Sequence, residues 1–314
     1  MTGLAHTTFP ERIRPVVMFG AAGLPRAEIE TLQTHPQFEA ACRAIVSGMV
    51  DLYQGNRLLN TVVNDRGRLV IGYLTLYLHF GTREDDPRSG LTLGRLKTIC
   101  VQQNICSAGR AEALVAVMRL FGYLEPASDA ADRRVRRLVP TEKLIATYQE
   151  RWERVMAALG WIRPEGIAAL PAIRRFEFVS ALVRQYTEHF LAGIRILDHS
   201  PDLTLFTDRN AGLMVAFSLT LDSCDEGFTP TRPVTVSISA LSRRFGVSRV
   251  HVRKMLRDAC DEGFIARPEG EEGLVVIQPK MTDATHAFLA TIFRFVAHCA
   301  GAALDEVGAS LPRN

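Results

Sequence analysis

The chain has 314 residues, which suits two domains, and its 47% hydrophobic and 23% charged residues exclude global disorder. The net charge of +3 is weak support for a nucleic-acid partner, so such a function depends on where the charges lie. Six cysteines form no CxxC pair, and no Cys/His group has zinc-ligand spacing, so we expect no metal site.

The first half opens with a predicted arm and two helices. Residues 1–36 hold scattered Pro and Gly, and we interpret them as an N-terminal arm that packs on the body or on another subunit. Apolar residues at helical spacing predict a helix over residues 38–60. Residues 68–80 are apolar on most faces, which predicts a second helix at the centre of the core. Both helices belong to a first domain predicted over residues 37–160.

A helix-turn-helix is predicted next. Thr92 and Ser107 each precede an apolar helical run, and their hydroxyls are suited to cap the two helix starts. The second of these helices ends at Gly122-Tyr123-Leu124 and carries Arg110 near its start.

A turn-rich loop and a predicted strand over residues 133–140 follow this helix pair. Alternation along the strand turns Arg134 and Arg136 away from the core, and Arg133 stands at the edge of the loop. A further helix is predicted from Thr141 to about residue 159.

This half resembles the MarR family of bacterial winged-helix regulators over about residues 69–159. The resemblance rests on Gly122-Tyr123-Leu124 after the second helix, Asp132-Arg133 in the loop, Val135 and Leu138 in the strand, and Thr141 at the next helix. It implies a DNA-reading helix, a homodimer with interlocked terminal helices, and a pocket for a small aromatic effector. The candidates in this chain to line such a pocket, if they are not core residues, are Tyr73, Tyr77, Phe80, Trp152 and Phe217.

A stretch punctuated by Pro and Gly, residues 161–175, predicts a linker to a second domain over residues 176–314. The strongest motif of the chain lies in this domain, at residues 241–256 with the sequence LSRRFGVSRVHVRKML. Gly246 suits the tight turn of a helix-turn-helix, and Ser248 is suited to cap the second helix.

The outward face of this motif is basic. Apolar residues four apart, Leu241 with Phe245 and Val252 with Leu256, should point inward. The basic residues left outside are Arg243, Arg244, Arg249, Arg253, Lys254 and Arg257, with His251 near the boundary. A basic face after a capped start is what a helix needs to enter the DNA major groove. The alternative is an ordinary solvated basic helix.

Two strands and a tight loop follow, over residues 264–267 and 274–277, as in the wing of a winged helix. The loop is acidic, with Glu269, Glu271 and Glu272, and phosphate would repel it.

The two halves match each other in blocks at nearly constant separation, which indicates an internal duplication. Ser107 pairs with Ser248, and Gly122-Tyr123-Leu124 pairs with Gly263-Phe264-Ile265. The predicted fold class is therefore mainly α with small β-wings (α+β): tandem winged helix-turn-helix domains that form a pseudo-two-fold monomer resembling a MarR dimer. Two recognition helices would then lie about one DNA turn, roughly 34–36 Å, apart.

We predict a sequence-specific transcription regulator that binds double-stranded DNA. Base readout is assigned to Ser248, Arg249, His251 and Arg253, with Ser107 and Arg110 in the matching places of the first half. The other predicted DNA contacts are Arg243, Arg244, Lys254, Arg133, Arg134 and Arg136. A tandem winged-helix replication initiator and an interaction scaffold without DNA binding remain alternatives.

Other classes of function receive less support from the sequence. The P-loop, GxGxxG and HExxH motifs are missing, so we expect neither an enzyme nor a cofactor. The first residues lack the features of a signal peptide, and the apolar segments of about twelve residues are too short for a bilayer. We therefore expect a cytoplasmic, nucleoid-associated protein without membrane contact, as a monomer or a homodimer.

Overall fold

The computed structural model describes residues 26–55, 66–83, 85–86, 89–127, 136–271 and 273–308. The described chain is mainly helical, with one two-stranded and one three-stranded antiparallel sheet. This confirms the coarser part of the predicted fold class, a mainly α chain with small β elements.

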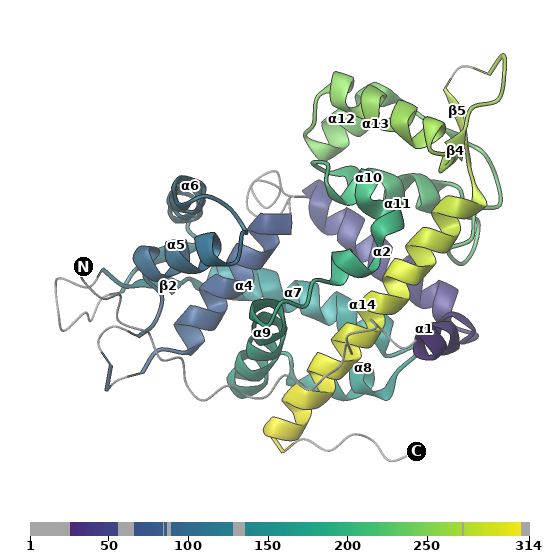
Figure 1. Cartoon of the computed structure of the whole chain (residues 1–314). Coiled ribbons are helices and arrows are strands. Elements are labelled where there is room, and N and C mark those ends of the chain that lie inside the picture. The colour runs from purple at the N-terminus through teal and green to yellow at the C-terminus, as the bar shows by residue number, and fades with distance from the viewer. Residues whose placement is uncertain are drawn as a thin grey trace.

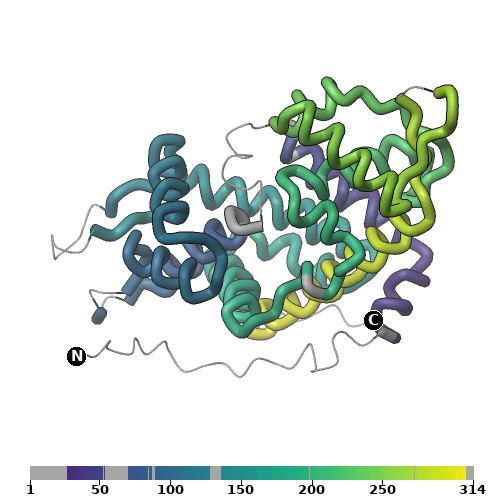
Figure 2. The backbone as a smooth tube through the Cα atoms, turned by 45° about the horizontal axis from the view of Figure 1, so that its top comes forward, coloured from purple at the N-terminus to yellow at the C-terminus, as the bar shows by residue number. Residues whose placement is uncertain are grey.

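Two lobes lie on either side of a set of long central helices (Figures 1 and 2). The first lobe comprises α4 (Arg66–Phe80), α5 (Leu93–Gln102), α6 (Ala108–Leu120), β1 (Leu124–Pro126) and β2 (Leu138–Pro140). The second lobe comprises α10 (Thr204–Thr207), α11 (Gly212–Asp222), β3 (Val234–Thr235), α12 (Ile238–Phe245), α13 (Arg249–Asp261), β4 (Ile265–Ala266) and β5 (Leu274–Ile277). The central elements are α1 (Arg26–Gln33), α2 (Phe38–Gly55), α7 (Glu142–Leu159), α8 (Pro164–Ala169), α9 (Phe176–Leu191) and α14 (Pro279–Glu306).

The sheets of the two lobes follow the same plan. In the second lobe, β5 lies between β3 and β4, with Val234 opposite Val275 and Ile265 opposite Ile277. In the first lobe, β2 pairs with β1, and an isolated bridge joins Thr92 to Arg137 on the far side of β2. In each lobe, the second strand of the hairpin that follows the helix pair therefore lies beside the chain that precedes the first helix.

The two halves of the sequence are interleaved. Helix α2 packs on α7 of its own half and on α11 of the second lobe, while α9 packs on α14 of its own half and on α4 of the first lobe. Aromatic rings also pack across the two halves. The ring centroids of Tyr53 and Phe245 lie 5.5 Å apart, and those of Phe176 and Phe80 lie 5.3 Å apart. Packing contacts therefore cross the predicted boundaries at residues 160 and 176.

Helices α4 and α11 are apolar on most sides because neighbours surround them. Helix α4 contacts α5, α9 and β2, and α11 contacts α2, α10 and α12. The prediction that residues 68–80 form a central core helix is confirmed.

The segment predicted as a linker, residues 161–175, is a packed helical segment instead. It forms α8 and the 3₁₀ helix Leu170–Ala172, and α8 packs on α7 and α14. Pro164 starts α8, a position where its missing N–H costs nothing, so the proline marks a helix start and not a loop. At Gly166, an added Cβ would lie 2.3 Å from the Gly160 nitrogen, so close contact requires glycine there.

The predicted N-terminal arm lies mostly outside the described residues. Its described part, α1, packs on α14, and Glu28 forms an ion pair with Arg294. This part of the arm packs on the body of the same chain.

Helix α14 is long and apolar enough to cross a bilayer by length and composition, but 67% of its most apolar window is buried within the protein. The sequence estimate of the longest apolar segment was too short, because polar residues such as His286 and Arg294 interrupt this helix without ending its apolar face.

Helix α2 holds the loop between α11 and β3. The Glu39 carboxylate accepts hydrogen bonds from the Phe228 amide (3.1 Å) and the Thr229 hydroxyl, and Arg43 donates to the Gly227 carbonyl (3.1 Å). Gly227 adopts a φ of +63°, and an added Cβ would lie 2.5 Å from the Glu39 carboxylate. These contacts fix α2 on the second lobe.

Replacing Glu39 with Gln should lower the free energy of unfolding by about 1 kcal/mol, since a neutral amide accepts weaker hydrogen bonds than a carboxylate. Burial alone raises the pKa of Glu39, but hydrogen bonds from Thr229 and Phe228, together with His286, outweigh it and hold the pKa below 4.5. This stabilisation is therefore complete above pH 4.5 and is lost as the pH falls through the folded-state pKa. Urea denaturation of both proteins between about pH 7 and pH 3 measures these effects.

Glu177 provides the matched control, because it lies at the corresponding place in the first turn of α9 and is exposed. E177Q should leave both the stability and its pH dependence unchanged. Equal losses in E39Q and E177Q would show that the contact of Glu39 with the second lobe adds no stability.

Candidate nucleic-acid interface

The turn between α12 and α13 has the predicted geometry. Gly246 ends α12 with a φ of +66°, and the Val247 amide donates to the Ser242 carbonyl. The Ser248 hydroxyl caps α13 by accepting from the His251 amide at 3.1 Å. Because glycine adopts positive φ without a steric cost, this turn joins the helices tightly.

The inward faces of both helices are buried as predicted. Leu241 and Phe245 of α12 and Val252 and Leu256 of α13 all lie in the core. The opposite face of α13 is therefore fixed toward solvent.

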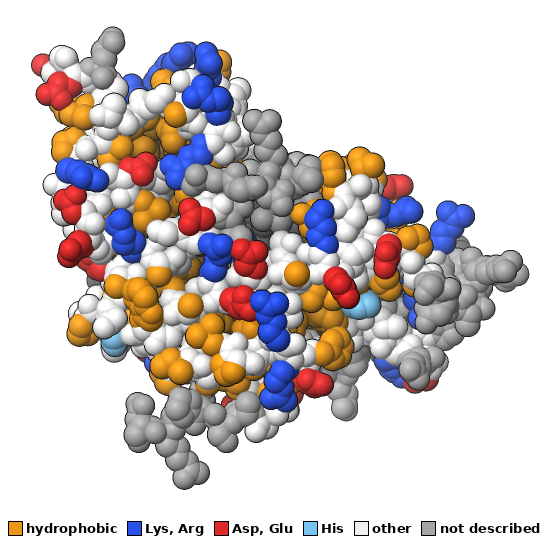
Figure 3. Space-filling view, turned by 180° about the vertical axis from the view of Figure 1, so that it is seen from behind, with side chains coloured by type: hydrophobic (Ala, Val, Ile, Leu, Met, Phe, Trp, Pro, Cys, Tyr) orange, Lys and Arg blue, Asp and Glu red, His pale blue; other side chains and the backbone are white. Residues whose placement is uncertain are grey.

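Five of the predicted basic residues are exposed: Arg243 of α12, and Arg249, Arg253, Lys254 and Arg257 of α13. Figure 3 shows Lys and Arg side chains gathered at the tip of the second lobe. Lys254 forms an ion pair with Asp258 at 2.8 Å, and Arg209 pairs with the same carboxylate. The first two turns of α13 thus hold basic side chains, while acidic residues begin only at Asp258.

Two predicted DNA contacts, Arg244 and His251, are half-buried and bond to other parts of the second lobe. Arg244 is half-buried, donates to the Ser218 hydroxyl of α11 at 2.6 Å and lies 3.8 Å from Asp222. His251 is half-buried, with its Nε2 3.0 Å from the Asn210 carbonyl oxygen. Both side chains hold the helix pair against α11 and the loop before it.

The β4–β5 hairpin has mixed charge. Glu269 and Glu271 are exposed in its loop, Glu272 lies outside the described residues, and Arg267 is exposed at the end of β4. Arg267 was not among the DNA contacts predicted from the sequence, although a basic residue at the end of a predicted wing strand is a candidate for such a contact.

The first lobe repeats the capped turn with weaker charge. The Ser107 hydroxyl accepts from the Arg110 amide at 3.3 Å, and both residues are exposed. Asn104 adopts a φ of +52° in this turn, one residue after the C-cap of α5, whereas the positive φ of the other turn lies at the C-cap Gly246. Arg136 is exposed as predicted, whereas Arg133 and Arg134 lie outside the described residues.

The outer face of α6 is less basic than that of α13, because its exposed charged residues are Arg110, Glu112 and Arg119. Glu112 pairs with Lys97 of α5 at 2.7 Å, and the small residues Ala113 and Ala116 are exposed beside them. Leu120, at the end of the helix, is 78% exposed. The two lobes therefore present helices of different chemistry at equivalent places.

The two lobes also share the same contacts at the end of the second helix of each pair. Gly122 and Gly263 both adopt positive φ, at +69° and +75°, before a fully buried ring of Tyr123 or Phe264. The ammonium groups of two lysines, Lys143 and Lys280, lie 4.6 and 4.2 Å from these ring centroids and donate to carbonyls at the end of the preceding helix.

Among the described residues, no group of three or more His, Cys, Asp or Glu side chains is placed to hold a metal ion. No protein-family model, curated protein or solved structure matches this chain. Only the geometry and charge of the α5–α6 and α12–α13 pairs therefore indicate what these helices bind.

Replacing Gly246 with Ala should destabilise the protein by about 1 kcal/mol, because the residue would be held at a positive φ that L side chains rarely adopt. No atom lies within 4 Å of the added Cβ, so the loss reports backbone strain alone. Gly109 of α6 has equally open space but helical geometry, so G109A should instead stabilise by about 0.5 kcal/mol. Urea unfolding measures both, and effects of the same sign would contradict a left-handed turn at Gly246.

Proposed function

We propose that this chain is a sequence-specific DNA-binding transcription regulator with two winged helix-turn-helix units. In the first unit, α5 and α6 precede the β1–β2 wing; in the second, α12 and α13 precede the β4–β5 wing. The observation that carries the proposal is the start of α13, a capped helix with Arg249, Arg253 and Lys254 exposed on one face and an apolar opposite face.

The amino end of α13 is the part suited to the major groove. Ser248 caps the helix, and the positive end of the helix dipole then points the same way as the basic side chains. Arg249 and Arg253 lie one turn apart, so both reach the same groove, where arginine can bond two acceptors of guanine. We assign base readout to Ser248, Arg249 and Arg253, and phosphate contact to Arg243 and Lys254.

The bonds of Arg244 and His251 within the lobe support a different role for these two residues. Each joins the helix-turn-helix to α11 or to the Asn210 carbonyl, and so sets the angle at which α13 leaves the lobe. We therefore assign positioning, and not base readout, to both.

The repeated turns, caps and lysine–aromatic contacts support an internal duplication. The exchange of α2 and α9 between the lobes resembles the interlocked helices of a MarR homodimer, here within one chain. In the first unit we assign DNA contact to Ser107, Arg110 and Arg136, with Arg133 and Arg134 as further candidates. One chain then offers two reading helices for one pseudo-palindromic or asymmetric site in the cytoplasm.

A protein-interaction scaffold is the second candidate, and two observations favour it. The outer face of α6 is less basic than that of α13 and includes an exposed Leu120, and the wing of the second lobe carries Glu269 and Glu271. A gel-shift assay on random duplex across a salt series separates the two functions. Binding that weakens steeply with salt supports DNA recognition, and no binding at low salt supports the scaffold.

Replacing Arg249 with Ala should weaken binding to a selected DNA site by roughly 1–3 kcal/mol, relative to random duplex, through the loss of a base contact. In vitro selection on the wild-type protein first supplies the site. Fluorescence anisotropy at one fixed salt concentration then measures both affinities.

Arg163→Ala is the charge-matched control, because Arg163 is exposed before α8, among the central helices and away from α13 (Figure 1). It should leave the ratio of specific to random affinity unchanged. If R249A also leaves this ratio unchanged, base readout by α13 is wrong. Mass measurement of the complex then shows whether one or two chains occupy the site.

A further inference from the structure

A cavity of about 370 Å³ lies between the two lobes, at the place where the interleaved helices meet. Its described lining residues come from α2, α4 and α7 of the first half and, in the second, from α9, α10, α11, α14 and the segments that join α9, α10 and α11. A volume of this size is in the range of cavities that bury small organic ligands. Of the five residues that the sequence suggested for an effector pocket, Tyr73 and Trp152 line it, and Tyr77, Phe80 and Phe217 do not.

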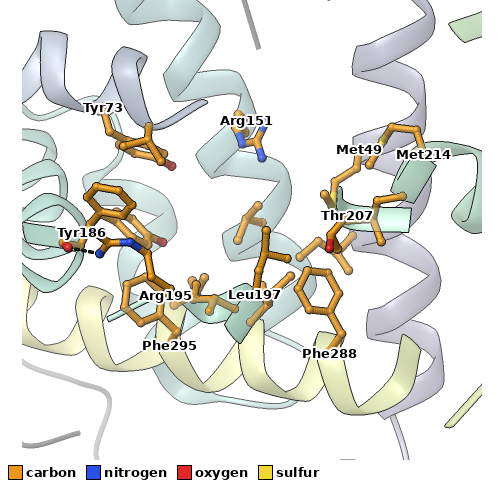
Figure 4. A pocket seen from close by; sticks show the side chains of 18 of the residues that line it. Met49, Tyr73, Arg151, Tyr186, Arg195, Leu197, Thr207, Met214, Phe288 and Phe295 are labelled. Atoms are coloured by element: carbon orange, nitrogen blue, oxygen red, sulfur yellow. Dashed lines mark hydrogen bonds between the residues drawn. The ribbon is translucent and has the colours of Figure 1, made fainter. Parts of the chain in front are cut away.

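The cavity has two chemically different ends (Figure 4). At one end Tyr73 and Tyr186 lie together, with 5.3 Å between their ring centroids, and Tyr148 lies 5.2 Å from Tyr73. At the other end the side chains of Met49, Met214 and Phe288 face the space. A ligand that fills the cavity must therefore be elongated and mostly apolar.

The charges in the lining have one sign. Of the lining residues that the structure describes, Arg151, Arg195 and Arg209 are cationic, and none is Asp or Glu. Arg195 donates to the Phe190 carbonyl and to Gln103, and Arg209 pairs with Asp258.

Arg151 differs from the other two arginines. It is half-buried on α7, and no hydrogen bond or ion pair joins it to any residue in the described part of the chain. Figure 4 shows its guanidinium group reaching from α7 toward the middle of the cavity, between the two ends. A partly desolvated cation without a counter-charge is unfavourable, and an anion bound beside it removes that cost.

The aromatic end also offers neutral hydrogen-bond donors. Thr187 is 2% exposed and lines the cavity, and its hydroxyl has no hydrogen-bond partner among the described residues. Burial raises the pKa of Tyr73, Tyr148 and Tyr186, and the charge of Arg151 opposes this only in part. These tyrosines therefore keep their hydroxyl protons at neutral pH.

We propose that this cavity binds an elongated, mostly apolar molecule with one anionic head group, held by Arg151 beside the Thr187 and tyrosine hydroxyls. The apolar tail lies among Met49, Met214 and Phe288. The ligand spans both halves of the chain, so a single molecule occupies the protein. This site depends on the cavity alone and stands whether or not α13 reads DNA.

Titration calorimetry with decanoate and decan-1-ol tests the proposal, because the two probes share a ten-carbon chain and differ in head-group charge. Decanoate should bind the full-length protein with one-to-one stoichiometry, and roughly ten-fold more tightly than decan-1-ol. Decanoate should also raise the melting temperature, since it binds the folded state.

R151Q should remove the preference for decanoate while leaving the affinity for decan-1-ol unchanged, and R151K should keep part of the preference. R154Q is the matched control: Arg154 lies three residues further along α7 and pairs with Glu150 at 2.9 Å, outside the cavity lining. R154Q should bind both probes as the wild type does.

M214W should block both probes by filling the apolar end, with far-ultraviolet circular dichroism as the check that the variant folds. If M214W fails to fold, the Arg151 variants alone decide the head-group assignment. Equal affinity for the two probes, no binding of either, or an unchanged preference in R151Q would each overturn the proposal. The assay contains no DNA, so its outcome is separate from that of the DNA-binding experiments.

Discussion

The exchange of α2 and α9 between the lobes is the constraint on which the rest of the structure depends. Helix α2 packs on α7 of its own half and on α11 of the second lobe. Helix α9 packs on α14 of its own half and on α4 of the first lobe. The buried ring of Phe38 in the first half packs on Phe293 of α14, so removing the second half would uncover it. Burial of a large apolar side chain contributes about 1.5–3 kcal/mol. The described buried residues of the two halves therefore form one shared core.

Local features could be predicted from the sequence, and the exchange could not. A cap such as Ser248 or a turn such as Gly246 depends on residues within about one helical turn, so its spacing is visible in the chain. The apolar stripe on α2 is the same whether it packs on its own lobe or on the other one. Pro164 was misread because proline marks both loops and helix starts, and only packing of α8 on α7 and α14 decides between them.

The positions of the basic residues were visible in the sequence, but which of them bond to other residues of the protein was not. Arg243 and Arg244 are adjacent and equally basic, yet one is exposed and the other bonds to Ser218 of α11. Helices α13 and α6 show how two copies of one unit can differ. Both keep an apolar inner face, because each must pack on the core of its lobe. The outward faces carry no such constraint. Helix α13 exposes four cations, whereas α6 exposes Arg110 and Arg119 beside Glu112 and two alanines.

The cavity follows from the same exchange, because it lies where helices from both halves meet around α7. Its signal in the sequence is slight: Arg151 stands beside the buried stripe of Tyr148, Trp152 and Met156, where an apolar residue is expected. A ligand there touches the helices that place each lobe. If it favours one spacing of the lobes, linkage requires that any partner selecting the same spacing change the ligand affinity by the same factor. A pocket inside one lobe would contact that lobe alone, whereas residues of α4 in the first lobe and α11 in the second both line this cavity.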